Sequence, residues 1–201
     1  MSFIFDKCFS EDCDEFKGLY QILPECHKDA RGYFLESWNK RDFDAAGINA
    51  DFVQDNKSSS VKGVLRGLHF QKNHSQSKLL WTDSGTIFDV AVDLRNGSET
   101  FGKHFKIILD SSKHNMLFIP KGFAHGFLVL SEAADIYYKC TDFYDPKGEG
   151  GILYNDPVLN IDWKSVCADF DNIILSEKDK KHDAFCADKK YFDINGNWIG
   201  D

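Results

Sequence analysis

The residues of this chain that could do chemistry gather in three stretches. These stretches cover residues 29–36, 52–71 and 119–127, and they hold more arginine, histidine and amide side chains than a plain β-barrel requires. The second stretch is followed closely by Lys78, and the third leads into the tyrosines of DIYYKCTDFY at 135–144. Such a mixture of titratable groups is what acid–base chemistry on a small polar ligand needs.

Each candidate residue also has a simple structural explanation. Arg31 and Glu36 could form an exposed pair on a strand, which would contribute little stability. His69 stands between two apolar residues, and a lone histidine in that position is more often a satisfied core residue. Tyr138 could pack its ring in the core with its hydroxyl at the surface.

Taken together, the stretches indicate a ligand site. Arg66 and His69 are three positions apart, so a regular strand places them on opposite faces. A bulge or twist at Gly67, which lies between them, would change that. Little side-chain bulk surrounds His125, which lets a ligand come close to the backbone; the small residues are Gly122, Ala124 and Gly126.

A metal site is one alternative for these histidines. Metal-binding cupins usually carry two histidines separated by one residue, but positions 67 and 71 beside His69 are glycine and glutamine. His74 lies five residues away in a polar loop, and His125 has no histidine partner in the sequence around it. Because neutral nitrogens without a nearby carboxylate make a poor transition-metal site, we expect no metal. Zinc sites use closely spaced ligand pairs, which the N-terminal set lacks: Cys8, Cys13, Cys26 and His27.

Short strands must position these groups. Residues 87–94 (IFDVAVDL) alternate in the period-two pattern of a half-buried strand. Further strands with turn signals between them are expected at 104–109, 116–119, 126–130 and 135–143. Many short strands at nearly even spacing predict an all-β sandwich or barrel. Helical signal is confined to 40–46 and part of 163–181, and the polar last twenty residues should wrap the surface or a partner.

Length and charge exclude several classes of protein. With 201 residues, 42% of them apolar, the chain can bury the core of one domain, and no stretch approaches the roughly 18 apolar residues of a membrane span. The 24 basic and 32 acidic residues give a net charge of −8, which opposes a nucleic-acid partner but leaves a small anionic ligand possible. The acidic start resembles no secretion signal and the six cysteines form no CxxC motif, so reduced thiols in the cytoplasm are expected.

Over about residues 18–180 the sequence resembles the dTDP-4-dehydrorhamnose 3,5-epimerases of nucleotide-sugar biosynthesis. Besides Lys78 and Tyr138, the matching segments are D-x-R-G-x-F-x-E (29–36), F-V-Q-D-N (52–56), V-L-R-G-L-H-F-Q (64–71), D-V-A-V-D-L-R (89–95), T-F-G (100–102), I-P-K-G-F-A-H-G-F (119–127), E-G-G-I (149–152), N-D-P (155–157) and L-S-E-K-D (175–179). A single R-G-x-H would be weak, but so many segments in order make a specific match.

The resemblance implies a cupin-type jelly-roll barrel with a few short peripheral helices, one domain over residues 1–201, and a homodimer. It implies catalysis on a dTDP-sugar without metal or organic cofactor. His69 would be the general base, Tyr138 the general acid, Lys78 a neighbour of the ketone oxygen, and Asp179 the support of His69. The substrate-binding residues would be Arg31, Glu36, Gln54, Asn56, Arg66, His125, Glu149 and Lys178.

The chemistry of a 4-keto sugar asks for these residue types. The hydrogens on C3 and C5 are both α to the carbonyl, so a neutral histidine can remove either one near pH 7. The resulting negative charge moves to the ketone oxygen, where a fixed cation such as Lys78 stabilises the transition state. A carboxylate behind the imidazole fixes its tautomer. Inversion then needs a proton from the opposite face, which a tyrosine hydroxyl can deliver, and the diphosphate needs arginine-type donors.

The sequence departs from the usual family pattern in three places. Trp81 replaces a common arginine, Tyr154 replaces a common tryptophan, and the tail at 181–201 lacks the short proline-containing ending. These changes leave the catalytic pair His69 and Tyr138 in place.

From the resemblance and the chemistry together, we expect an epimerase that inverts C3 and C5 of dTDP-4-dehydro-6-deoxy-D-glucose. An epimerase of one centre, or of another nucleotide-linked sugar, is the nearest alternative, and a non-catalytic jelly roll that binds a sugar nucleotide is a third.

Overall fold

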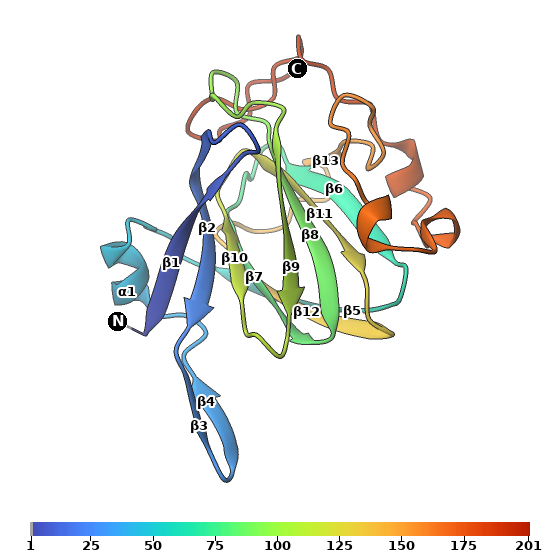
Figure 1. Cartoon of the computed structure of the whole chain (residues 1–201). Coiled ribbons are helices and arrows are strands. Elements are labelled where there is room, and N and C mark those ends of the chain that lie inside the picture. The colour runs from blue at the N-terminus through green and yellow to red at the C-terminus, as the bar shows by residue number, and fades with distance from the viewer. Residues whose placement is uncertain (1) are drawn as a thin grey trace.

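The computed structural model describes residues 2–201 and consists mainly of two antiparallel sheets that face each other (Figure 1). The six-stranded sheet has the order β1 (Phe3–Phe9), β2 (Glu15–Pro24), β10 (Met116–Ile119), β7 (Lys78–Ser84), β12 (Ala133–Cys140) and β5 (Gln54–Val61). The five-stranded sheet has the order β13 (Glu149–Gly151), β6 (Leu65–Gln71), β11 (Phe123–Val129), β8 (Thr86–Asp93) and β9 (His104–Asp110). The predicted all-β jelly-roll class is therefore confirmed.

The strands expected from the sequence are present with small changes at their ends. Four of them are β8, β9, β10 and β11, and β10 has the expected bounds. The strand expected at 135–143 is β12, which ends at Cys140 because the chain turns there. A helix at 40–46 is also confirmed as α1 (Lys40–Ala45), whose first turn is capped by the Asn39 side chain. The stretch 163–181 forms only short 3₁₀ turns, at Lys164–Val166, Phe170–Asn172 and Asp179–Lys181.

Strand β8, which lies between β11 and β9, is buried on both faces, so the prediction of a half-buried strand was wrong. Ile87 and Ala91 point into the space between the two sheets, where they pack with apolar side chains of β7 and β10. Phe88 and Val90 point the other way and pack against the C-terminal part of the chain. Because both faces of the strand are shielded from water, apolar residues occur on both of them, and Ile87 and Ala91 alternate with Asp89 and Asp93 on one face.

The C-terminal tail covers that second face. Phe185, Tyr191 and Phe192 are buried, and isolated bridges join Phe192 to Arg95 and Asp183 to Ile152. In Figure 1 this orange and red part of the chain lies beside and above the five-stranded sheet. The expectation that the tail wraps a surface is thus met on its own chain, where its aromatic residues complete the core.

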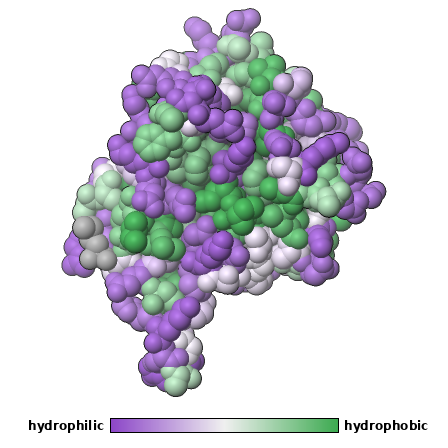
Figure 2. Space-filling model, viewed as in Figure 1, coloured by the Kyte–Doolittle hydropathy of each residue, from purple (hydrophilic) through white to green (hydrophobic). Residues whose placement is uncertain are grey.

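The hairpin of β3 (Cys26–Asp29) and β4 (Gly32–Leu35) projects from the body of the molecule (Figure 1). Tyr33 and Phe34 near its tip are 62% and 67% exposed. On the face shown in Figure 2, apolar residues gather over the middle of the barrel, while the hairpin is mostly hydrophilic with a pale apolar tip. No helix among residues 2–201 is long and apolar enough to cross a membrane.

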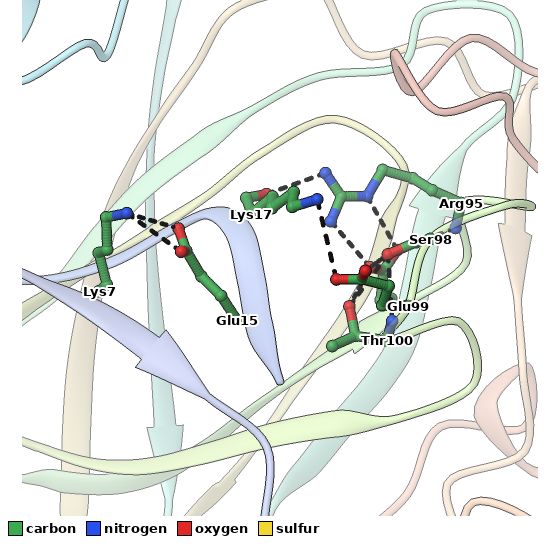
Figure 3. A network of polar contacts seen from close by, with 8 residues as sticks. Lys7, Glu15, Lys17, Arg95, Ser98, Glu99 and Thr100 are labelled. Carbon is green, nitrogen blue, oxygen red and sulfur yellow. Dashed lines mark hydrogen bonds and ion pairs between the residues drawn. The ribbon is translucent and has the colours of Figure 1, made fainter. Parts of the chain in front are cut away.

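A buried ion pair fastens the start of β2 to the end of β8 (Figure 3). The Arg95 guanidinium donates to both oxygens of Asp93, at 2.9 and 2.8 Å, and to the backbone oxygen of Lys17 at 2.9 Å. The hydroxyls of Ser98 and Thr100 donate to the same carboxylate at 2.7 and 2.6 Å. Every oxygen of this buried carboxylate therefore has a donor, which is the condition for keeping a charge inside a core.

Candidate active site

Three of the four predicted catalytic residues, His69, Lys78 and Tyr138, line one cavity of about 300 Å³. His69 comes from β6 in one sheet, whereas Lys78 and Tyr138 come from β7 and β12 in the other. The cavity is lined by Gln54, Asn56, His69, Phe70, Gln71, Gln76, Lys78, Tyr138, Tyr144 and Glu149. A base on one sheet thus faces a phenol and an ammonium on the other.

An irregularity in β6 brings Arg66 and His69 to the same face. His69 pairs with His125 of β11 and Arg66 pairs with Phe127, so three steps along β6 match two steps along β11. Gly67 has a φ of +126°, and a Cβ there would lie 2.6 Å from the Gly126 Cα. The expectation that a bulge at Gly67 matters is confirmed, since only glycine fits this close approach.

Asp179 stands directly behind His69. Its Oδ1 lies 2.5 Å from His69 Nε2, and the Ser176 hydroxyl donates to its Oδ2 at 2.8 Å. Burial alone would raise the pKa of the Asp179 carboxyl, but the hydrogen bonds from His69 and Ser176 outweigh it and hold the pKa below its ordinary value. The ionised carboxylate accepts from Nε2–H, which leaves the lone pair of His69 on Nδ1, ready to take a proton.

Lys78 and Tyr138 are neighbours on the opposite wall. Lys78 pairs with Cys140 in the ladder between β7 and β12, and Cys140 is two positions from Tyr138, so both side chains point into the barrel. Desolvation lowers the pKa of the Lys78 ammonium, against the charges of Cys140, Asp89 and Glu149. Desolvation raises the pKa of the Tyr138 hydroxyl, which therefore keeps its proton at neutral pH.

His125 lies behind this cavity rather than on its wall. Its Nε2 lies 2.8 Å from Asp89 Oδ2, and the other oxygen of this fully buried carboxylate has no hydrogen-bond partner among the described residues. The Asp89 charge acts on Lys78 and raises its pKa. The Asp89–His125 pair therefore places a negative charge close to the Lys78 ammonium.

Polar side chains hold the mouth of the cavity. Lys178 pairs with Glu149, and the Tyr144 hydroxyl donates to Glu149 Oε2 at 2.6 Å. Burial would raise the pKa of Glu149, but these two partners hold it below its ordinary value. Gln54 donates to Asn56 at 3.0 Å on β5. The exposed Arg66 guanidinium donates to the Ser60 hydroxyl at 3.2 and 3.1 Å, which leaves donors free for an anion.

Two predicted site residues lie elsewhere in this chain. Arg31 is on the projecting hairpin, with its side chain 90% exposed and one guanidinium nitrogen 2.6 Å from Asp29 Oδ2. Glu36 follows the hairpin and accepts from Asn39 at 3.3 Å. Neither lines the cavity that holds His69. Six of the other predicted residues line the cavity, and the remaining four contact its lining residues or lie beside them: Arg66, His125, Lys178 and Asp179.

Sequence reasoning missed His182, which stands beside Asp179. Its Nε2 lies 3.5 Å from Asp179 Oδ1, and its ring meets the His69 ring edge to face with centroids 5.4 Å apart. Desolvation and the neighbouring His69 lower the pKa of His182. No carboxylate or paired histidine stands near His69 in the sequence, but the fold brings both from a segment more than a hundred positions later: Asp179, as the resemblance implies, and His182, which was not expected. The only sign in the sequence is that His182 is the second residue of the tail (181–201) that departs from the family pattern.

The N-terminal zinc set does not assemble. Among residues 2–201 the one group of at least three metal-type ligands is His69, Asp179 and His182. Cys8 is buried in β1, Cys13 is exposed in the turn after it, and Cys26 and His27 belong to the hairpin. All six cysteines are free thiols.

Comparison with known proteins identifies the family. The sequence profile described as dTDP-4-dehydrorhamnose 3,5-epimerase matches residues 14–187. A dTDP-4-dehydrorhamnose 3,5-epimerase of Pseudomonas aeruginosa is 50% identical over 163 residues, which are 81% of this chain and 88% of that protein. The crystal structure of such an epimerase from Elizabethkingia anophelis is 46% identical, with a TM-score of 0.83, and the match covers 92% of this chain and 97% of that one.

A second solved structure holds a ligand. It is a dTDP-6-deoxy-D-glucose-3,5-epimerase from Legionella pneumophila in complex with dTDP-4-keto-L-rhamnose, 44% identical with a TM-score of 0.81. The match covers 90% of this chain and 93% of that one. The resemblance read from the sequence motifs is confirmed by both kinds of comparison. The chain belongs to the dTDP-4-dehydrorhamnose 3,5-epimerase family.

Proposed function

We propose that this chain inverts C3 and C5 of dTDP-4-dehydro-6-deoxy-D-glucose and gives dTDP-4-dehydro-L-rhamnose. The observation that carries the proposal is the placement of His69 with its carboxylate on one sheet, opposite Tyr138 and Lys78 on the other, around a single cavity. Membership of the epimerase family and similarity to a structure that holds dTDP-4-keto-L-rhamnose support the choice of substrate.

Proton removal starts at His69. Its Nδ1 takes the hydrogen from the carbon next to the ketone, and the electron pair of the C–H bond moves into an enolate. Asp179 stabilises the imidazolium through the 2.5 Å hydrogen bond to Nε2. Lys78 stabilises the negative charge on the enolate oxygen, which is absent from the substrate, so its effect falls on the transition state.

Tyr138 completes the inversion. Because it lies on the sheet opposite His69, its hydroxyl can protonate the carbon from the face that the base did not use. The desolvation that raises its pKa keeps the hydroxyl proton available at neutral pH. The Tyr138 phenolate then regains a proton from solvent and the His69 imidazolium releases one to solvent, after which the same pair of groups can serve the second carbon.

The nucleotide end of the substrate requires cations at the mouth. The Arg66 guanidinium, held by Ser60, is placed to bind the diphosphate. Arg31 can contribute only if its hairpin reaches another molecule, and we propose a homodimer in which it does so. We further propose the cytoplasm as the compartment, which the six free cysteines support.

Hydrogen exchange followed by NMR tests the proposal. Incubation with dTDP-4-dehydro-6-deoxy-D-glucose in D2O should give deuterium at both C3 and C5 together with the inverted product. Deuterium and inversion at C3 alone would instead make the chain an epimerase of one centre. Absence of exchange at both carbons, with the substrate still bound, would reduce the chain to a sugar-nucleotide-binding protein.

A further inference from the structure

A set of metal-type ligands lies behind the proposed base. His69, Asp179 and His182 each offer one ligand atom, and these atoms all lie within 4.8 Å of one another. Asp179 Oδ1 is central, 2.5 Å from His69 Nε2 and 3.5 Å from His182 Nε2. Two imidazole nitrogens and one carboxylate oxygen are a donor set that suits zinc and similar divalent ions.

The His182 nitrogen has no hydrogen bond to satisfy it. Its side chain is only 9% exposed, and Nε2 has no hydrogen-bond partner among the described residues. The ring packs flat against Gly151, where an added Cβ would lie 2.4–2.5 Å from three ring atoms. A buried ring nitrogen without a hydrogen bond requires an explanation, and a cation bound between this nitrogen and the Asp179 carboxylate would provide one.

We propose that His69, Asp179 and His182 bind one divalent ion of the zinc class, and that this ion reversibly inhibits the epimerase. The inhibition rests on the proposed function; the binding does not. The ion binds through the lone pair of His69 Nε2, so the Nε2 proton is released to solvent while Nδ1 takes one up from solvent, and the neutral ring carries its single proton on Nδ1. With Nδ1 protonated, His69 has no lone pair for the substrate.

The site lies where an ion can reach it. His69 faces the substrate cavity, and His182 borders a second cavity of about 210 Å³ beneath the C-terminal tail. Glu149 lines both cavities, so a carboxylate stands at the border between them. The nearby Lys178 ammonium is already paired with Glu149, and the open coordination position on the ion is left for water or a substrate oxygen.

Binding is measured first, independently of activity. After treatment with chelator and its removal, the protein should take up one Zn²⁺ per chain in calorimetry. With Co²⁺ as a spectroscopic probe it should show visible d–d absorption without the thiolate charge-transfer band that cysteine ligands produce. His182→Asn and His182→Gln should each weaken Zn²⁺ binding at least about tenfold and keep the thermal midpoint of the parent chain. Matched controls are His27→Asn, an exposed histidine on the hairpin, and Cys186→Ser, an exposed thiol of the tail.

Inhibition is measured second. The metal-free enzyme should be fully active, Zn²⁺ should reduce its turnover in step with site occupancy, and both His182 variants should lose this sensitivity while turning over substrate. Equal inhibition of the parent and the His182 variants, or a thiolate band in the Co²⁺ spectrum, would overturn the proposed site. Activity that requires Zn²⁺ would overturn the inhibitory role. A chain that binds Zn²⁺ as described but shows no epimerisation either with or without metal would refute the proposed function and leave the proposed metal site unaffected.

Discussion

His69 removes the proton from carbon and Tyr138 returns one to the opposite face, so substitutions at the two residues should abolish different steps of the reaction. His69→Asn removes the only lone pair that can take the carbon-bound hydrogen, so both deuterium uptake and product should vanish. Tyr138→Phe leaves the enolate step intact, and reprotonation from the His69 face restores the starting configuration. NMR in D2O should therefore show labelled but uninverted substrate for Tyr138→Phe and no label for His69→Asn. Inversion without His69, or full turnover without Tyr138, would contradict the assignment.

Lys78 should set the alkaline limb of the pH profile. Desolvation lowers the pKa of its ammonium and raises the pKa of the Tyr138 hydroxyl, so burial makes Lys78 easier and Tyr138 harder to deprotonate as the pH rises. Stabilisation of the enolate is then present below the pKa of Lys78 and is lost above it. Lys78→Arg should remove this limb because a guanidinium does not titrate in the range, with a plateau lowered about tenfold by the altered geometry.

The measurement is kcat as a function of pH for both enzymes. A matched control is Lys139→Arg, since Lys139 is on the same strand as Tyr138 but pairs with Asp55 outside the cavity. This control should keep the limb of the parent chain. An alkaline limb that persists unchanged in Lys78→Arg would assign it to a different group.

At the scale of the elements, the approach of β6 to β11 decides where His69 stands. Gly67→Ala would place a methyl group 2.6 Å from the Gly126 Cα and 2.8 Å from the His125 backbone oxygen, at a φ of +126°. Both neighbours are backbone, so the strands must separate and shift the base. We expect kcat to fall about 100-fold, the usual effect of a displacement near 1 Å in an active site.

A substitution at a second glycine, Gly97, tests the effect of backbone strain alone, without a displacement of His69. Gly97 also has a positive φ, +90°, but nothing lies within 4 Å of the position of its Cβ. Gly97→Ala should therefore lower stability by about 1 kcal/mol and leave kcat nearly unchanged. Steady-state kinetics and thermal unfolding of the two variants make the comparison. Equal activity of both would mean that the tight contact at Gly67 has no effect on His69.

The junction of β2 and β8 depends on the Asp93–Arg95 pair. Asp93→Asn keeps the shape of the side chain but leaves the Arg95 guanidinium buried without its counter-charge, which should cost about 3–5 kcal/mol of the free energy of unfolding. Glu99→Gln is the control in the same loop, because Glu99 pairs with Lys17 at 3.8 Å with a side chain 71% exposed. That control should change stability by less than about 0.5 kcal/mol in urea unfolding.

The elements differ in how well the sequence predicts them, for physical reasons. The period-two pattern of β8 identifies a strand, but it does not show that aromatic residues from an otherwise polar tail, Phe185, Tyr191 and Phe192, cover the outer face. The three-residue spacing of Arg66 and His69 does not decide whether they lie on the same face of the strand. The bulge at Gly67 places both on one face. The motifs include most of the residues that line the cavity, but not Gln76 or Tyr144. His182 has no local pattern, because only the path of the tail brings it to Asp179.

At the scale of the whole molecule, the hairpin of β3 and β4 projects from the body and contributes no residue to the cavity that holds His69 (Figure 1). Arg31 lies near its tip and, among residues 2–201, pairs only with Asp29, while Tyr33 and Phe34 are mostly exposed. In a dimer with two-fold symmetry, each hairpin that reaches the partner is matched by one that reaches back. The proposed homodimer thus gives Arg31 a place at the diphosphate of the partner's site.

Subunit mixing should reveal this arrangement. Arg31→Ala and His69→Asn should each be weakly active or inactive alone. In a mixed dimer, the site with an intact His69 on the Arg31→Ala chain receives an intact Arg31 from the other chain. Unfolding and refolding the two variants together at equal amounts should restore activity to about one quarter of the wild-type value, since half of the dimers are mixed and each has one complete site.

The same mixture separates the two ways of placing Arg31. If Arg31 served the cavity of its own chain, the mixed dimer would contain one site without Arg31 and one without His69, and no activity would return. A mixture of His69→Asn with Tyr138→Phe is the control, because both residues line one cavity of one chain and their sites stay incomplete however the subunits pair. Recovery in the first mixture and none in the second would place the hairpin in the partner's site. Recovery in neither would remove Arg31 from the partner's site and leave its exposed position without a catalytic role.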